Sequence, residues 1–140
     1  MAVQIVKSGM NRPFTASGDI VVGQVVKLSS TADYAQVAED GYTGLKGVCV
    51  GGYQYKTSTG DNGTANTIAE GFICDIALPK SHIVKLTAVA AIAKGAPIEA
   101  AGNAGGSIKE NVEGAGGYSN FMGYAMEAAT ASGDIIECLI

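Results

Sequence analysis

The stretch F-I-C-D-I-A-L, at residues 72–78, decides the fold class because its residues alternate between two faces. Successive side chains of an extended chain point to opposite sides, and a period of two is typical of a β-strand. One side of this stretch carries four apolar residues: Phe72, Cys74, Ile76 and Leu78. The same alternation recurs at 82–88, 121–128 and 135–140, and we expect further strands near 3–7, 20–28, 34–38, 45–51 and 96–100.

Glycines separate these apolar stretches. The chain has 20 glycines in 140 residues, about twice the usual share of roughly 7%. About nine short strands joined by tight turns, with little helix, predict an all-β fold: a compact antiparallel β-barrel or sandwich. At 81–94 an Ala-rich middle between Ser81 and Gly95 also fits a short helix. We expect a strand at 82–88, with a helical turn at 89–94 as the alternative.

A single domain is expected from a chain of 140 residues, which is long enough to bury its own core. Five of the six residues at 135–140 are apolar, so we expect this segment to be a strand paired inside the sheet. The segment K-S-G-M-N-R-P-F at 7–14 has the character of an arm that leads into the domain. We therefore assign residues 1–14 to an N-terminal arm and 15–140 to a single β-rich domain.

Charge and hydropathy together disfavour two classes of partner, nucleic acids and membranes. Nine basic residues are scattered among 13 acidic ones, for a net charge of −4. Nucleic-acid binding needs clustered positive charge, so no nucleic-acid partner is expected. The longest weakly polar run, at 86–93, is far shorter than the ~20 residues that span a bilayer, so no membrane partner is expected. No secretory signal is visible near the N-terminus, and we expect synthesis in a cytoplasm.

No catalytic, metal or cofactor site is expected. The three cysteines occur without a C-x-x-C pair or a Cys–His spacing typical of zinc, and we interpret Cys49, Cys74 and Cys138 as small buried hydrophobic residues. His82, the one histidine, has no nucleophile elbow to serve and is expected at a surface or turn position.

The hexapeptide T-A-S-G-D-I occurs twice, at 15–20 and 130–135. Asp19 and Asp134 are therefore candidates for acid–base chemistry, but S-G-D is also typical of turns. In that interpretation Gly18 and Gly133 take left-handed conformations, and the Asp side chains bond the turn backbone. A looser repetition links the strand starts at 15–22 and 91–99, and L-K-G-V-C-V at 45–50 with F-M-G-Y-A-M at 121–126. We interpret the hexapeptide as a structural turn that begins a strand.

The polar stretch at 51–67 carries Tyr53 and Tyr55. Tyrosine rings beside Asn and Asp side chains suit carbohydrate recognition, so this loop is one candidate binding site. The alternative is a long exposed hairpin tip or a contact between subunits.

Six phrases, in this order, resemble the small capsid decoration (cement, head-stabilising) proteins of tailed bacteriophages: A-S-G-D-I-V-V-G-Q-V-V-K-L, G-L-K-G-V-C-V, E-G-F-I-C-D-I-A-L, I-A-K-G-A-P-I-E-A-A-G, F-M-G-Y-A-M-E-A and S-G-D-I-I-E-C-L-I. The resemblance covers about residues 14–140 and departs from the family at 51–67 and 107–113. It implies a β-rich module, commonly a homotrimer, on the outer capsid surface of the virion. Such a module binds the major capsid protein of an expanded head and cements neighbouring capsomers against internal DNA pressure.

Under this resemblance, the N-terminal arm is the candidate capsid contact. Its apolar residues are Val3, Ile5, Met10 and Phe14. Val3 and Ile5 alternate with Gln4, so the arm could add a strand to an exposed edge of a capsid protein. The alternative is an ordinary edge strand of the barrel. The alternative function is a carbohydrate-binding module on the virion surface that uses Tyr53 and Tyr55.

Overall fold

The computed structural model describes residues 5–7, 11–29, 33–52, 67–79, 82–101, 106–111 and 120–140. Every regular element in these ranges is a β-strand, and there are thirteen of them. The all-β prediction is therefore confirmed. None of the described residues belongs to a helix that is long and apolar enough to cross a membrane.

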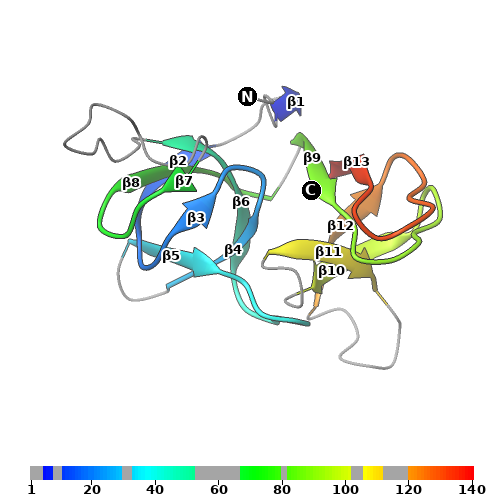
Figure 1. Ribbon diagram of the computed structural model, residues 1–140, viewed down its shortest axis with the longest axis horizontal. Coiled ribbons are helices and arrows are strands. Elements are labelled where there is room, and N and C mark those ends of the chain that lie inside the picture. The colour runs from blue at the N-terminus through cyan, green and yellow to red at the C-terminus, as the bar shows by residue number, and fades with distance from the viewer. Residues whose placement is uncertain are drawn as a thin grey trace.

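The first half of the chain forms a closed five-stranded barrel, in the order β2-β5-β4-β6-β8 (Figure 1). Its strands are β2 (Asn11–Ala16), β4 (Val25–Leu28), β5 (Tyr34–Val37), β6 (Lys46–Gly52) and β8 (Ile73–Ala77). All neighbours are antiparallel except β2 and β5, whose parallel pairing closes the barrel. A small two-stranded sheet accompanies the barrel, made of β3 (Ile20–Val21) and β7 (Thr67–Ile68).

The second half, together with β1 from the start of the chain, forms a six-stranded sheet in the order β1-β9-β13-β12-β10-β11. Its strands are β1 (Ile5–Lys7), β9 (Ile83–Thr87), β10 (Pro97–Ala101), β11 (Ser107–Glu110), β12 (Phe121–Ala125) and β13 (Ile135–Leu139). A parallel bridge between Ala88 and Ile108 brings the end of β9 against β11. The sheet therefore curls back on itself, as the barrel of the first half does.

The two halves repeat the same topology. Strands β2, β5, β4, β6 and β8 correspond to β9, β11, β10, β12 and β13, with the same neighbours and directions. The parallel pair Ala16–Ala35 matches the pair Ala88–Ile108. Individual hydrogen bonds also match: Gly23 N–H donates to Cys49 O at 2.7 Å, and Gly95 N–H donates to Ala125 O at 2.7 Å. The repetition predicted between 45–50 and 121–126 thus belongs to a repeat of a whole structural unit. The other predicted match is wrong, because the equivalence of Gly23 and Gly95 aligns 91–99 with 19–27 and not with 15–22.

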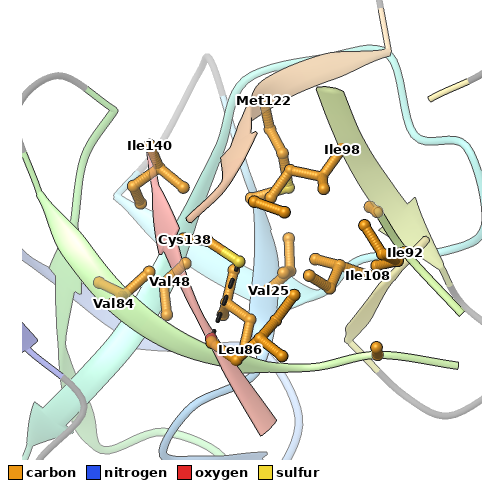
Figure 2. Close-up of a cluster of buried hydrophobic side chains, with 14 of the residues drawn as sticks. Val25, Val48, Val84, Leu86, Ile92, Ile98, Ile108, Met122, Cys138 and Ile140 are labelled. Carbon is orange, nitrogen blue, oxygen red and sulfur yellow. Dashed lines mark hydrogen bonds between the residues drawn. The ribbon is translucent and has the colours of Figure 1, made fainter. Parts of the chain in front are cut away.

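A shared apolar core joins the two halves. Val26 faces into the first barrel, whereas its neighbour Val25 faces out of it, into the core of the second half. Val48 of the first half joins the same cluster (Figure 2). Ala38, also of the first half, belongs to it too. Both valines of β4 are fully buried because each face of this strand has its own core.

Several boundaries differ from the predictions. Strands β2, β7 and β11 lie in segments where no strand was expected, and a turn at 22–23 divides the strand expected at 20–28. The helical alternative at 89–94 is wrong, since Ile92 forms a β-bridge with Ala129. The segment at 135–140 does contain a strand inside a sheet, because β13 lies between β9 and β12.

The boundary of the N-terminal arm is also wrong for residues 11–14. Asn11–Ala16 is a barrel strand that pairs with β8 along Asn11–Thr15. The sequence pattern did not predict this strand because Asn11, Arg12 and Pro13 are polar or unfavourable in strands. They lie at the exposed start of β2, and only Phe14 and Ala16 are buried.

Candidate functional site

The three cysteines lie in the core. Burial raises the pKa of Cys49 and Cys138 to about 12 and that of Cys74 to about 11. All three side chains are fully buried and free of disulfide bonds. At neutral pH they are protonated thiols that pack as small apolar groups. Among the described residues, no group of three or more His, Cys, Asp or Glu could hold a metal ion.

His82 is fully buried, so its expected surface position is wrong. Its Nε2 lies 2.9 Å from Asn11 Oδ1, and Asn11 Nδ2 donates to Asp75 Oδ2 at 3.4 Å. The backbone of His82 also pairs with that of Ile140, whose N–H donates to His82 O at 3.0 Å. His82 therefore connects the start of the second half to strand β2 of the first.

The two copies of T-A-S-G-D-I occupy different places in the structural repeat. Each precedes a strand, and both glycines have positive φ, 132° at Gly18 and 95° at Gly133. Gly133 N–H donates to Ala88 O, a bond that matches the one from Gly71, not Gly18, in the first half. The second copy is thus the counterpart of 68–73, I-A-E-G-F-I, and the first copy that of 87–92, T-A-V-A-A-I.

The two aspartates accept different hydrogen bonds. Asp19 Oδ1 accepts from Glu70 N–H at 3.0 Å, which links the residue before β3 to the turn after its partner strand β7. Asp134 Oδ2 accepts from Thr130 N–H at 2.8 Å, Thr130 Oγ1 at 3.0 Å and Ala131 N–H at 3.2 Å. These bonds, the Thr130 backbone bond above all, lower the pKa of Asp134. The two carboxylates share no hydrogen-bond donor, so these bonds do not join them into one acid–base site.

The predicted capsid contacts have different placements. Phe14 is 5% exposed in the core of the first barrel and is unavailable to a partner. The strand that contains Ile5 pairs with β9 at the edge of the second sheet, with Ile5 opposite Val84. Val3, Met10, Tyr53 and Tyr55 lie outside the described residues.

An exposed apolar surface covers the outside of β12 and β13. It comprises Tyr124 (50% exposed), Met126 (40%), Ile135 (62%) and Leu139 (39%), and we call it the β12–β13 face. Tyr124 lies directly opposite Leu139, and the Phe121 ring packs edge-on against Tyr124 at 5.1 Å between centroids. Grouped exposed apolar side chains of this kind are typical of a contact surface. The period-two pattern identified these residues but could not tell which face was the outer one.

A hollow of about 390 Å³ lies on the first half, over β4 and β5. Lys27, Leu28, Tyr34, Gln36 and Tyr42 are among its lining residues. The Lys27 ammonium pairs with Glu39 at 2.8 Å and lies 5.8 Å from the Tyr42 ring centroid. The hollow therefore combines aromatic rings with polar side chains that are already held in place.

The comparisons with known proteins concern the fold. No protein-family model matches the sequence, and no curated protein matches it. Among solved structures, the chain is similar to one described as the head fiber gp8.5 N base in bacteriophage phi29. The TM-score is 0.55 at 13% sequence identity, and the match covers 94% of this chain and 92% of that chain. At this identity the similarity shows a shared fold that extends over nearly the whole of both chains.

Proposed function

We propose that this protein is a structural component of a tailed-bacteriophage virion that binds the outer surface of the head. The observation that carries the proposal is the fold match to a phage head fiber base over 94% of this chain, including both halves of the repeat. The six sequence phrases that resemble capsid decoration proteins support the same assignment independently. The proposed role is non-catalytic.

The finer part of the proposal is that the protein cements neighbouring subunits of the major capsid protein. A protein that binds only the expanded, assembled lattice stabilises that lattice by mass action. The scattered lysines and the net charge of −4 are compatible with a position outside a DNA-filled shell. Binding at the junction of two capsid subunits would oppose their separation under internal pressure.

We place the capsid contact at the N-terminal edge of the second sheet. Strand β1 lies at one end of the sheet order, and its outer edge pairs with no other described strand. An edge strand offers unpaired N–H and C=O groups to which a partner strand can add. Phe14 has no part in this contact because it belongs to the barrel core.

Co-sedimentation with purified heads tests the function. The protein is mixed with expanded and with unexpanded heads, and bound protein is quantified in the pellet. We expect binding to expanded heads only. Binding to neither form would contradict the capsid role and would favour the carbohydrate-binding alternative, which a glycan array then examines.

A truncation tests the contact. Removing residues 2–13 would delete the first half of β2 and open the barrel, so the informative variant lacks residues 2–7 and keeps β2 intact. We expect it to unfold close to the wild-type temperature and to lose binding to heads. Leu45→Ala, which removes a 55% exposed side chain between β5 and β6, is the control and should still bind. Full decoration by the truncated chain would exclude β1 as the contact.

A further inference from the structure

The contact between the two halves has two complementary sides. The first side is the outer surface of β4 and β6, where the cross-strand pair Val25–Val48 is fully buried against the second half. The second side is formed by β10 and β11: Gly106 O accepts from Val25 N–H at 2.6 Å, and Ala100 O accepts from Gly41 N–H at 2.9 Å. An ion pair between Lys109 and Asp40 at 2.9 Å lies at the same contact.

Because the two halves repeat the same topology, each half also carries a surface that corresponds to the other half's side of this contact. In the second half, the pair Pro97–Tyr124 corresponds to Val25–Val48, and this position belongs to the β12–β13 face. Tyr124 is half exposed there, whereas Val48 is fully buried. The second half therefore presents an uncovered copy of the surface by which the first half is bound.

The first half carries the counterpart of the side that β10 and β11 form in the second half. The register of β4 with β5 matches that of β10 with β11, so Leu28 and Gln36 correspond to Ala100 and Lys109. Leu28 and Gln36 line the hollow of about 390 Å³. The hollow thus occupies, on the first half, the position at which the second half binds the first. No described segment of the same chain fills it.

We propose that these two open surfaces bind each other between copies of this chain, with the β12–β13 face of one copy docked into the hollow of the next. The contact repeats, between molecules, the contact that already joins the two halves within one molecule. It joins unlike surfaces, so each copy keeps one surface of each kind and can continue into a closed ring or a chain of copies.

The side chains suit such a contact. Tyr124 offers a large, stiff apolar ring with a hydroxyl group, the kind of side chain that is enriched at the centres of interfaces. The hollow offers Tyr34, which is half exposed, beside the polar side chain of Gln36. Tyr and Leu at 124 and 139 replace Val and Ala at the corresponding positions 48 and 77, so the second half presents larger apolar side chains than the first half does.

The inference goes beyond the proposed function and does not depend on it, because the purified protein without heads tests it. Size-exclusion chromatography with light scattering is expected to give a mass that is a multiple of 14.1 kDa for the full chain. Tyr124→Glu and Tyr34→Glu, on opposite sides of the contact, should each lower the mass toward one chain. Ile73→Glu changes a 44% exposed side chain outside both surfaces and should leave the mass unchanged.

Mixing the variants distinguishes unlike surfaces from like ones. A Tyr124→Glu copy keeps an intact hollow, and a Tyr34→Glu copy keeps an intact β12–β13 face, so the mixture should form dimers of one copy each. Thermal unfolding of each variant confirms that the chain is folded. A wild-type protein that is monomeric at about 100 μM, or a folded Tyr124→Glu protein that keeps the wild-type mass, would overturn the proposal. So would a mixture of folded monomeric variants that forms no dimer.

Discussion

Strands β6 and β8 in the first half and strands β12 and β13 in the second make the same pairing with opposite exposure. Val48 faces Ala77, and both are fully buried, whereas Tyr124 faces Leu139, and these are 50% and 39% exposed. The strand pairing is the same in both places, so the difference arises from what packs outside each pair of strands. A β-strand that is apolar on both faces therefore indicates two neighbouring layers, and the second layer can belong to another part of the chain or to another molecule.

The largest expected effect concerns the cysteines, which report on the two halves separately. Cys49 and Cys74 lie in the first half and Cys138 in the second, and burial raises the pKa of all three thiols. Alkylation should be at least roughly a thousandfold slower than in the unfolded chain, because reaction requires the core to open.

Pulsed alkylation across a denaturant series, read by mass spectrometry, measures each site. The halves share one apolar cluster, so we expect all three sites to become reactive over the same denaturant range. Two separate midpoints would show that the halves unfold independently and would contradict a shared core.

The next effect compares two equivalent glycines, Gly47 and Gly123. A Cβ at position 123 would clash with backbone atoms, Leu139 O and Ile140 Cα, whereas a Cβ at 47 would clash with the Ile76 side chain as well as Ala77 O. Backbone yields less than a side-chain methyl group, so Gly123→Ala should destabilise by about 3 kcal/mol and Gly47→Ala by about 2 kcal/mol. Urea unfolding measures both, and a reversed order would refute this account of the two close approaches.

A third, smaller effect separates the buried face from the exposed one. Val48→Ala removes two buried methyl groups from the contact between the halves and should cost about 2 kcal/mol of unfolding free energy. Leu139→Ala lies on the β12–β13 face and should change the stability of the single chain by less than about 0.5 kcal/mol. Unfolding at protein concentrations low enough to give single chains measures both. Equal losses would mean that Leu139 is covered within its own chain.

The smallest effect distinguishes the two copies of the hexapeptide by pH. Hydrogen bonds from Thr130 and Ala131 lower the pKa of Asp134, so the carboxylate stabilises the fold above the unfolded-state pKa. That stabilisation is lost as the pH falls through the lower, folded-state pKa. Asp134→Asn should therefore be less stable than wild type at pH 7, and the difference between the two should shrink progressively as the pH falls below about 4.

Thermal unfolding between pH 7 and pH 2 measures this convergence. Thr130→Val, which removes the Oγ1 donor and keeps the two backbone donors, is the matched control and should retain part of the pH dependence. A stability difference between wild type and Asp134→Asn that is constant over the whole range would rule out the carboxylate as its source.

Much of the fold could be predicted from local pattern. Alternation along 72–78, 82–88 and 135–140 gave three strands, and the glycine-led phrases at 45–50 and 121–126 gave the equivalent strands β6 and β12. Strand β2 was missed because only Phe14 and Ala16 of its six residues are buried. Its strand partners are distant in the chain, since Thr15 pairs with Tyr34 of β5 and with Ile73 of β8, and nothing local marks such pairings.

The candidate site was less accessible to prediction. The hexapeptide attracted attention because its letters are identical, but identical letters lie at non-equivalent places in the repeat. The Tyr124–Leu139 pair and the hollow beside Tyr34 carry no motif, and they emerge only when the two halves are compared residue by residue.

The sequence by itself determined the period of two, the turns and the apolar content, because side-chain alternation and backbone preference are local properties. The tertiary structure decided which face of each strand is buried, since a strand such as β4 has one valine in each of two cores. It also decided that Phe14 is core, that His82 is buried and that Tyr124 is exposed. Burial depends on which distant segments pack together, and a pattern read along one strand does not contain that information.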